Sequence, residues 1–383
     1  MLRAVVVPPG DAVSTLLPAL QAVIDGGASA LTPVAAGTDA STLSALRVGE
    51  AIDDDIALVV TTSGTTGPPK GALLSAAALR ASATATLERL GGPGRWLLAL
   101  PGHHIAGIQV LVRSLLAGTS PIELDLTAGF DVEALPAAVA ALGSGRRYTA
   151  LVATQLAKAL SVPAARAALA ELDAVLLGGG PAPQPVLDAA AAAQVRVVRT
   201  YGMSETVGGC VYDGLPLSGV QIRISEDGTI AVGGATLARG YRNPSVDRPG
   251  LDPFAEAGWF HTNDVGTLDV SGHLRVLGRA DDAISTGGLT VLPSVVEAAL
   301  ASHPAVADCA VFGIPDDRLG QRVVAAVVAA DSAAPPTLAD LRAQVLRSLD
   351  GTAAPREVHV VAELPRRGIG KLDRKALARH FTH

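Results

Sequence analysis

The feature that most constrains the fold is a repeated alternation of short apolar segments with segments of helical spacing. Strands are predicted where β-branched and other apolar residues gather, at 96–100, 148–153, 172–177 and 195–200. Helices are expected at 105–116 and 183–193, and Ser75 and Thr154 are expected to cap two more. Such alternation favours a parallel sheet with helices on its faces, because parallel strands need crossover connections. We therefore predict an α/β fold.

The character of the sequence changes twice towards the C-terminus. From about Ser218, short strands alternate with turns, which predicts an antiparallel β unit. After about Ala280 the expected order is helix, strand, strand, helix, strand, helix, typical of a small α+β domain. We predict a large N-terminal domain, residues 1–279, with mainly parallel, helix-covered sheets and a β subdomain. A small mobile α+β domain, residues 280–383, would follow, joined by a hinge at Asp281.

Composition excludes several classes of protein. The chain has 383 residues and 49% hydrophobic content, enough for a large core. Its net charge is -6 and its basic residues are spread along the chain, so we expect no nucleic-acid partner. No apolar run reaches membrane-spanning length, and Pro8 and Pro9 stop the apolar start too early for a signal peptide. Cys210 and Cys309 stand alone, which favours the reducing cytoplasm.

A loop rich in glycine and hydroxyl side chains follows the apolar segment 57–61. It consists of Thr62, Ser63, Gly64, Thr65, Thr66, Gly67, Pro68, Pro69 and Lys70. Glycines let backbone N–H groups approach an anion, hydroxyls add donors and the lysine adds positive charge, so the loop predicts a phosphate site. It is not a Walker loop, because two prolines precede the lysine and Gly71 follows it. An ordinary polar surface loop is the alternative.

Two further motifs stand where predicted strands end. Tyr-Gly-Met-Ser-Glu-Thr occupies 201–206, and the carboxylate of Glu205 suits a divalent cation that bridges phosphates. Gly-Gly-Gly-Pro-Ala-Pro occupies 178–183, and its glycines would let a flat ligand lie close to the backbone. Taken singly, each motif has a plain alternative, a turn with a surface glutamate or an ordinary strand-to-helix turn.

Four more segments contain residues of types that often bind ligands or take part in catalysis. They are 100–107, 258–266, 277–288 and 365–371, and they contain His104, Asp264, Arg279, Gly287, Gly288 and Lys371. Together and in this order, the motifs resemble the signatures of the adenylate-forming superfamily, which includes acyl- and aryl-CoA ligases, peptide-synthetase adenylation domains and firefly luciferase. The resemblance spans roughly residues 57–375.

The resemblance implies where ATP and Mg²⁺ would bind. The loop 62–70 would grip the β- and γ-phosphates of ATP, and Glu205 with Thr62 would hold Mg²⁺. The other residues that it assigns to the nucleotide are Gly179, Gly180, Pro181, Tyr201, Gly202, Met203, Ser204, Asp264 and Arg279. Among these, Tyr201 would stack on adenine, Ser204 would contact the α-phosphate and Asp264 would accept hydrogen bonds from both ribose hydroxyls.

Asn263 departs from the superfamily pattern, which has glycine at this place. Asparagine tolerates a positive φ better than most residues, so we expect it to keep that backbone geometry. Its neighbour His261 is expected to be structural rather than catalytic.

Catalytic roles also follow from the resemblance. Lys371 would bridge the carboxylate and phosphate oxygens during adenylation. Lys70 would supply positive charge at the phosphates, and Thr62 and Glu205 would act there by holding Mg²⁺. Rotation at Asp281 would then remove the lysine, and the Gly287–Gly288 segment would line the tunnel for the pantetheine of CoA. His104 would gate the acyl pocket, since attack by a carboxylate requires no general base.

The implied reaction joins a small carboxylic acid to the thiol of coenzyme A in two steps, with ATP converted to AMP and pyrophosphate. Within the superfamily, the short chain and the segments 176–183 and 285–288 most resemble the short actinobacterial o-succinylbenzoate-CoA ligases of menaquinone biosynthesis. Another aryl- or acyl-CoA ligase, or a catalytically silent nucleotide-binding protein, are the alternatives. A homodimer is possible by analogy. The sequence does not locate a group for the second carboxylate of o-succinylbenzoate.

Overall fold

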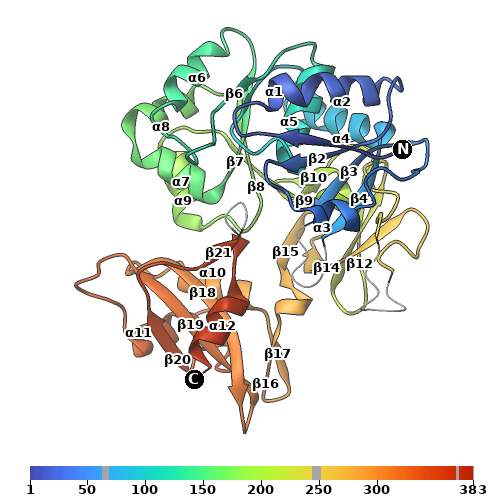
Figure 1. Cartoon of the computed structure of the whole chain (residues 1–383). Helices are drawn as coiled ribbons and strands as arrows, with labels where there is room; N and C mark the ends of the chain where they lie inside the picture. The colour runs from blue at the N-terminus through green and yellow to red at the C-terminus, as the bar shows by residue number, and fades with distance from the viewer. Residues whose placement is uncertain (63–68, 244–251, 368–370, 383) are drawn as a thin grey trace.

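The computed structural model describes residues 1–62, 69–243, 252–367 and 371–382. Figure 1 shows a large body formed by the N-terminal two thirds of the chain and a small body formed by the C-terminal part, with β15 (Leu274–Arg279) leading from one to the other. The mixed α/β fold confirms the predicted fold class. No helix among the described residues is both long and apolar enough to cross a membrane.

The first sheet of the large body carries the predicted phosphate loop. Its strands lie in the order β1 (Arg3–Val7), β2 (Leu31–Ala35), β3 (Ile56–Thr62) and β4 (Lys70–Ser75). The first three are parallel, whereas β4 is antiparallel to β3. Lys70 therefore opens a strand that the sequence did not predict. Residues 63–68 of the loop lie outside the described residues.

The second sheet confirms the predicted parallel core. Its order is β11 (Leu215–Pro216), β10 (Gly208–Tyr212), β9 (Val197–Met203), β8 (Ala174–Gly178), β7 (Arg147–Val152), β5 (Arg95–Leu98) and β6 (Ile122–Glu123). The five strands from β9 to β6 are parallel, and β10 and β11 add an antiparallel edge. Strand β9 runs on to Met203, so the first residues of the 201–206 motif belong to the strand rather than to a turn after it.

Helices fill the space between the two sheets and cover the second sheet from outside. The described helices of the large body are α1 (Ala12–Thr15), α2 (Leu17–Ile24), α3 (Ala40–Ala45), α4 (Ala76–Arg89), α5 (Ile105–Leu116), α6 (Leu135–Ala141), α7 (Ala153–Ser161), α8 (Pro163–Ala170) and α9 (Gln184–Ala192), of which α3 has no buried residue. One apolar cluster joins α1, α2, α4 and α5 to both sheets, and another packs α6 to α9 on the far face of the second sheet.

Helix capping was predicted correctly at one place and wrongly at another. Ser75 caps α4, since its hydroxyl accepts a hydrogen bond from the N–H of Ala78 at 3.2 Å. Thr154 is not a cap, because α7 already begins at Ala153. There the side chain of Gln155 reaches back and accepts from the N–H of Val152 at 3.0 Å, which replaces the expected hydroxyl.

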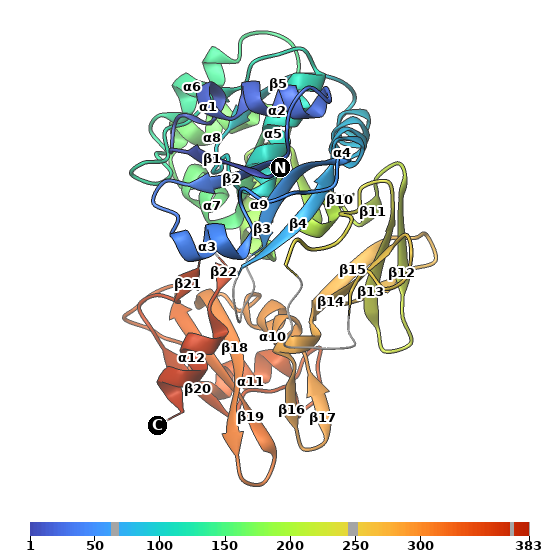
Figure 2. The same cartoon turned by 45° about the vertical axis from the view of Figure 1, so that its right-hand side comes forward.

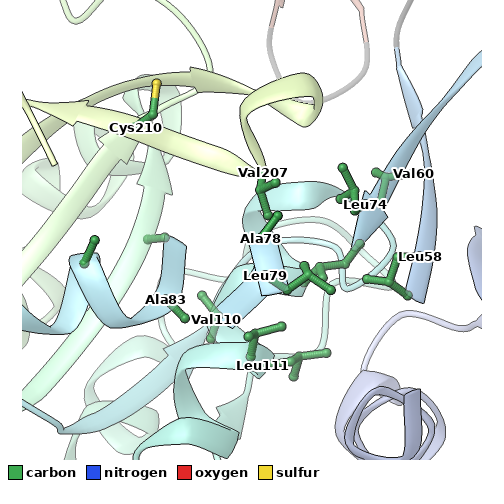
Figure 3. Close-up of a cluster of buried hydrophobic side chains, with 14 of the residues drawn as sticks. Leu58, Val60, Leu74, Ala78, Leu79, Ala83, Val110, Leu111, Val207 and Cys210 are labelled. Atoms are coloured by element: carbon green, nitrogen blue, oxygen red, sulfur yellow. The ribbon is translucent and has the colours of Figure 1, made fainter. Parts of the chain in front are cut away.

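The core between the sheets fixes the orientation of α5. Figure 3 shows side chains of β3, β4, α4 and α5 pointing toward one another, among them Leu58, Val60, Leu74, Ala78, Leu79, Val110 and Leu111. Val110 and Leu111 are fully buried there. Because a helix turns by about 100° per residue, Gln109 and Arg113 lie together on a different face of α5.

The third sheet is the predicted antiparallel β unit. It has the order β12 (Val220–Ile224), β13 (Thr229–Gly234), β14 (Trp259–Leu268) and β15, all antiparallel. Asn263 lies within β14 and is not among the residues with positive φ. The expectation of a positive φ there was wrong, because the residue continues the strand.

The small body has the predicted order of elements with two additions. Its sheet contains β17 (Leu289–Val291), β16 (Ile284–Thr286), β19 (Gly320–Ala329), β18 (Val306–Asp316) and β20 (Glu357–Val360), and its helices are α10 (Pro293–Leu300), α11 (Leu338–Val345) and α12 (Arg374–Phe381). The hairpin β16–β17 and the short pair β21 (Arg366–Arg367) and β22 (Lys371–Leu372) were not predicted. The boundary at 279/280 stays a prediction; the 3₁₀ helix η2 (Ala280–Asp282) lies at this point of the chain.

Candidate functional site

One large cavity of about 1400 Å³ brings together many of the predicted site residues that the structure describes. It lies at the carboxyl ends of the parallel strands in the first two sheets, where open α/β sheets bind ligands. Its walls also include the start of α5, part of β14 and the residues after β15. The predicted residues that line it are Thr62, His104, Gly179, Gly202, Met203, Ser204, Glu205, Asp264, Arg279 and Asp281.

On the wall formed by β9 and β14, a tyrosine and a carboxylate are paired. The hydroxyl of Tyr201 donates a hydrogen bond of 2.7 Å to Oδ2 of Asp264. Burial, followed by the charge of Asp264, raises the pKa of Tyr201 far above its usual value, so the tyrosine stays a hydrogen-bond donor. The backbone N–H of Asp264 donates to the hydroxyl of Thr262 at 3.0 Å, which fixes the carboxylate in the strand.

Arg279 links this carboxylate to the predicted hinge. Its guanidinium donates two hydrogen bonds to Asp281, at 2.8 and 2.7 Å, and its Nη1 lies 3.6 Å from Oδ1 of Asp264. The hydrogen bonds with Asp281 raise the pKa of Arg279. The predicted hinge residue and the cavity wall are thus joined by one charged side chain, whose two parallel donors match the geometry of a carboxylate.

Glu205 is held by a residue that the sequence did not single out. Its side chain is buried, and Oε1 accepts a hydrogen bond of 2.7 Å from the hydroxyl of Tyr241. Burial, followed by the charge of Glu205, raises the pKa of Tyr241 well above its usual value. Nζ of Lys70 lies 5.0 Å from the centre of the Tyr241 ring, so this tyrosine contacts both the predicted metal ligand and the predicted phosphate lysine.

The predicted metal ligands suit a cation that the phosphates of a bound nucleotide would also help to hold. Within the described ranges no group of three or more His, Cys, Asp or Glu side chains could bind a metal ion. Glu205 therefore offers a single carboxylate. Mg²⁺ is commonly bound through one or two carboxylates, with substrate phosphates and waters completing its shell.

Asn243 fixes the base of the phosphate loop and was also missed. Its Oδ1 accepts a hydrogen bond from the N–H of Gly71 at 2.9 Å, and its Nδ2 donates to the carbonyl of Pro69 at 2.8 Å. This residue lies far along the chain from the loop. No pattern within the loop could have indicated it.

Glycine is favoured for different reasons in the motifs 201–206 and 178–183. A Cβ at Gly202 would lie 2.0 Å from the carbonyl oxygen of Gly208, so glycine is required there by the close approach of β9 and β10. Gly179 has a φ of 83° and lines the cavity, which suits a ligand lying on the backbone. Gly180, Pro181, Tyr201 and Lys70 are not part of the lining, although Gly180, Tyr201 and Lys70 adjoin residues that are.

The wall formed by α5 carries two histidines at its start. His104 is the N-cap residue of α5 and lines the cavity, and its ring centre lies 4.4 Å from that of His103. Burial lowers the pKa of His103, so its ring is neutral at neutral pH. Further along the helix, Gln109 and Arg113 also line the cavity, and the sequence-based prediction had assigned neither to the site.

Two predicted residues of the small body are not brought to the cavity. Gly287 and Gly288, with φ of 59° and 78°, form the turn of the β16–β17 hairpin and are not part of the lining. Figures 1 and 2 show this hairpin at the end of the small body farthest from the large one, whereas β21 and β22 lie on the facing side. Lys371 begins β22; its side chain lies outside the described part of the structure.

Comparison with known proteins identifies the relatives of this chain. The family model described as AMP-binding enzyme matches residues 16–242, and the model described as AMP-binding enzyme C-terminal domain matches residues 295–371. A probable 2-succinylbenzoate–CoA ligase of Mycobacterium tuberculosis is 68% identical over 383 residues, which are 100% of this chain and 99% of the relative. A 2-succinylbenzoate–CoA ligase of a Geobacillus species is 35% identical over 350 residues, 85% of this chain and 69% of the relative.

Solved structures agree with these relatives. The o-succinylbenzoate CoA synthetase of Bacillus subtilis, in complex with its acyl-adenylate intermediate, matches with a TM-score of 0.79 and 27% identity, over 98% of this chain and 87% of that one. An amide bond synthetase of Marinactinospora thermotolerans matches with a TM-score of 0.78 and 26% identity, over 99% of this chain and 80% of that one. The chain belongs to the AMP-binding enzyme family of adenylate-forming proteins.

Proposed function

We propose that this protein is an AMP-forming ligase that joins o-succinylbenzoate, also called 2-succinylbenzoate, to coenzyme A. The observation that carries the proposal is the 68% identity, over the full chain, to a relative with the corresponding name. The cavity supports it, because Thr62, Ser204, Glu205 and Asp264 line one space that reaches the hinge. The use of ATP agrees with the family model and with the ATP and magnesium complex of the Bacillus subtilis relative.

The cavity would hold its substrates along two walls. The nucleotide end, which we define as Tyr201, Glu205, Tyr241, Asp264 and Arg279, would hold ATP. Asp264 would accept hydrogen bonds from the ribose, and Ser204 would donate one to the α-phosphate. Bound Mg²⁺, held by Glu205 and Thr62, would neutralise phosphate charge. The acyl end, which we define as His103, His104, Gln109, Arg113 and Tyr212, would hold the acid.

In the first step a carboxylate oxygen of the acid attacks the α-phosphorus of ATP. A new oxygen–phosphorus bond forms, the bond to the β-phosphate breaks and pyrophosphate leaves with the electron pair. The carboxylate is already ionised at neutral pH, so no base is required. The protein contributes position and positive charge, for which Lys371 and Lys70 are the proposed groups.

In the second step the thiol of CoA gives up its proton to solvent and its sulfur forms a bond to the acyl carbon. The bond between this carbon and the phosphate oxygen breaks, and AMP leaves with the electron pair. This step requires room where Lys371 stood, and rotation at Asp281 would provide it. The Gly287–Gly288 turn, which lies away from the cavity in this arrangement, would then approach it. A cytoplasmic location and a homodimer remain proposals that rest on the kind of reaction and on analogy.

Pyrophosphate release tests the proposed function. The protein is incubated with ATP, Mg²⁺ and o-succinylbenzoate, with and without CoA, beside a panel of benzoates and fatty acids. We expect release with o-succinylbenzoate alone and continuous turnover once CoA is added. Release only with another acid would keep the mechanism and discard the substrate. No release with any acid would indicate a nucleotide-binding protein without ligase activity.

A further inference from the structure

A short segment lies along β4, the last strand of the first sheet. It consists of residues 239–243, which we call the strap, and backbone hydrogen bonds join it to β4. The N–H of Leu73 donates to the carbonyl of Gly240 at 2.9 Å, and the N–H of Arg242 donates to the carbonyl of Gly71 at 2.7 Å. A Cβ on Gly71 would lie 3.3 Å from Cβ of Arg242, so the strap packs closely against the base of the phosphate loop.

Asn243, the last residue of the strap, holds the chain on both sides of Lys70. Its Oδ1 accepts a hydrogen bond from the N–H of Gly71 at 2.9 Å, and its Nδ2 donates one to the carbonyl of Pro69 at 2.8 Å. These two groups belong to the peptide bonds that precede and follow Lys70. Because a peptide unit is planar, holding one group of each unit fixes the backbone from which the lysine side chain starts.

Asn243 reaches the cavity only through its neighbours. It is not part of the lining, whereas Pro69 and Thr62 are. Thr62 in turn pairs with Lys70 across β3 and β4. An effect of Asn243 on a bound nucleotide would therefore pass through the base of the loop.

The strap also holds the predicted metal ligand. The hydroxyl of Tyr241 donates to Oε1 of Glu205 at 2.7 Å, and the N–H of Ala238, just before the strap, donates to the carbonyl of Glu205 at 2.8 Å. Nζ of Lys70 lies 5.0 Å from the centre of the Tyr241 ring. One continuous segment thus sets the position of the carboxylate relative to the lysine.

A side-chain amide that bonds to two backbone groups can also serve stability alone. Gln155 has this arrangement elsewhere, since it accepts from the N–H of Val152 at 3.0 Å and donates to the carbonyl of Ala99 at 2.8 Å. Asn243 differs because the peptide groups that it holds flank a lysine. A lysine side chain is long and flexible, so a fixed backbone limits where its ammonium group can lie.

Building on the proposed function, we propose that Asn243 is a positioning residue for the phosphates of ATP. It holds the peptide units on both sides of Lys70 and so directs the lysine to the β- and γ-phosphates, while Tyr241 in the same strap holds Glu205 for Mg²⁺. AMP and the acyl-adenylate lack these two phosphates. Asn243 therefore acts on ATP and on the first half-reaction, and the second half-reaction does not depend on it.

The first test compares the binding of ATP and of AMP by isothermal titration, with Mg²⁺ and without acid. Asn243→Ala should weaken ATP binding by about tenfold, as for other residues that orient a binding group, and leave AMP binding unchanged. Asn243→Gln keeps the amide on a longer side chain and should recover part of the loss. Equal losses for ATP and AMP, or unchanged ATP binding, would overturn the proposal.

A double-mutant cycle tests whether Asn243 acts through Lys70. In the Lys70→Met protein, Asn243→Ala should change ATP binding by less than about twofold, because the group that it positions is gone. A full tenfold loss in that protein would show that the two residues act independently, and it would overturn the proposed route.

Gln155→Ala is the matched control, because it removes the same two kinds of hydrogen bond outside the phosphate loop. It should leave the ratio of ATP affinity to AMP affinity unchanged, whatever it does to Tm. The same change of ratio in Gln155→Ala and in Asn243→Ala would assign both amides a general structural role and overturn the proposal.

Failure of the proposed function is recognised separately, as absent pyrophosphate release from the unaltered protein with o-succinylbenzoate. The role of Asn243 is then still judged by the titrations, which need no acid. Tighter binding of ATP than of AMP that is lost in Asn243→Ala supports it. Absent ATP binding to the unaltered protein contradicts it, since Lys70 would then have no phosphate to hold.

Discussion

At the nucleotide end of the cavity the buried side chains form close hydrogen-bonded pairs, whereas at the acyl end some buried polar atoms have no partner among the described residues. Tyr201 is bonded to Asp264 and Tyr241 to Glu205. Gln109 and Nε of Arg113 have no partner among the described residues. The nucleotide end is thus organised before its ligand arrives. Among the described residues, the acyl end keeps hydrogen-bonding atoms without a protein partner, which a bound ligand could use.

The largest expected effect concerns Lys371, which would act where the two ends meet. Lys371→Ala should slow adenylation by about a hundred- to a thousand-fold, the usual cost of one transition-state donor. Thioester formation from supplied acyl-adenylate should be spared. Single-turnover measurement of each half-reaction checks this, with the exposed Lys375→Ala as control. Equal loss in both steps would show that the lysine does not serve adenylation specifically.

The next effect concerns Asp281, which ties the nucleotide end to the small body through Arg279. Asp281→Pro should leave adenylation intact and slow thioester formation by about a hundred-fold, the scale of a misplaced reacting group, because the ring fixes φ at the hinge. Asp281→Ala loses the same side chain and keeps the backbone free, so it should retain the second step. If both variants slowed the second step alike, the ion pair rather than the backbone rotation would be responsible.

A smaller effect should follow from breaking one pair at the nucleotide end. Tyr241→Phe removes the hydrogen bond that orients Glu205 and should raise the Mg²⁺ concentration for half-maximal activity by about tenfold, as for other residues that orient a metal ligand. Tyr148→Phe is the control, since its hydroxyl bonds to the carbonyls of Leu90 and Gly92 outside the cavity. The same Mg²⁺ dependence in both variants would show that Tyr241 does not affect metal binding.

The smallest effect is a pH dependence at the acyl end. Burial lowers the pKa of His103, so the folded protein binds fewer protons there than the unfolded chain. The stability that this contributes is complete above the unfolded pKa of about 6.5 and is lost as the pH falls below it. Between pH 7.5 and 5.5, the Tm of His103→Gln should therefore fall less than the Tm of the unaltered protein. The difference should be at most about a few degrees. The exposed His380→Gln serves as control, and identical pH profiles would contradict the assignment.

Much of the fold and of the nucleotide end could be predicted, because both are encoded locally. Apolar strands alternating with helices specify a parallel sheet, and the motif residues follow strand ends in the sequence itself. The strand beginning at Lys70 was missed, since it depends on pairing with β3 and on Asn243, which lies 172 residues beyond Gly71. Tyr241 was missed for the same reason, because its bond to Glu205 is a tertiary contact.

The acyl end could not be predicted, because its polar residues are distinguished by their burial and not by their residue type. A glutamine and an arginine four residues apart on a helix usually indicate a face turned to solvent. Only the structure shows that Gln109 and Arg113 are buried, and that the side-chain amide of Gln109 and Nε of Arg113 have no partner among the described residues. Thr154 and Asn263 show the converse. Thr154 has a residue type suited to a cap, but the side chain of Gln155 makes the hydrogen bond at the start of that helix. Asn263 has a residue type suited to a turn, but it lies within strand β14.

A crystal structure of the protein with the adenylate of o-succinylbenzoate tests the comparison most directly. The account predicts that the ribose hydroxyls lie within hydrogen-bond distance of Asp264 and that the α-phosphate lies within hydrogen-bond distance of Ser204. A ribose that lies away from Asp264, or an α-phosphate that lies away from Ser204, would contradict it.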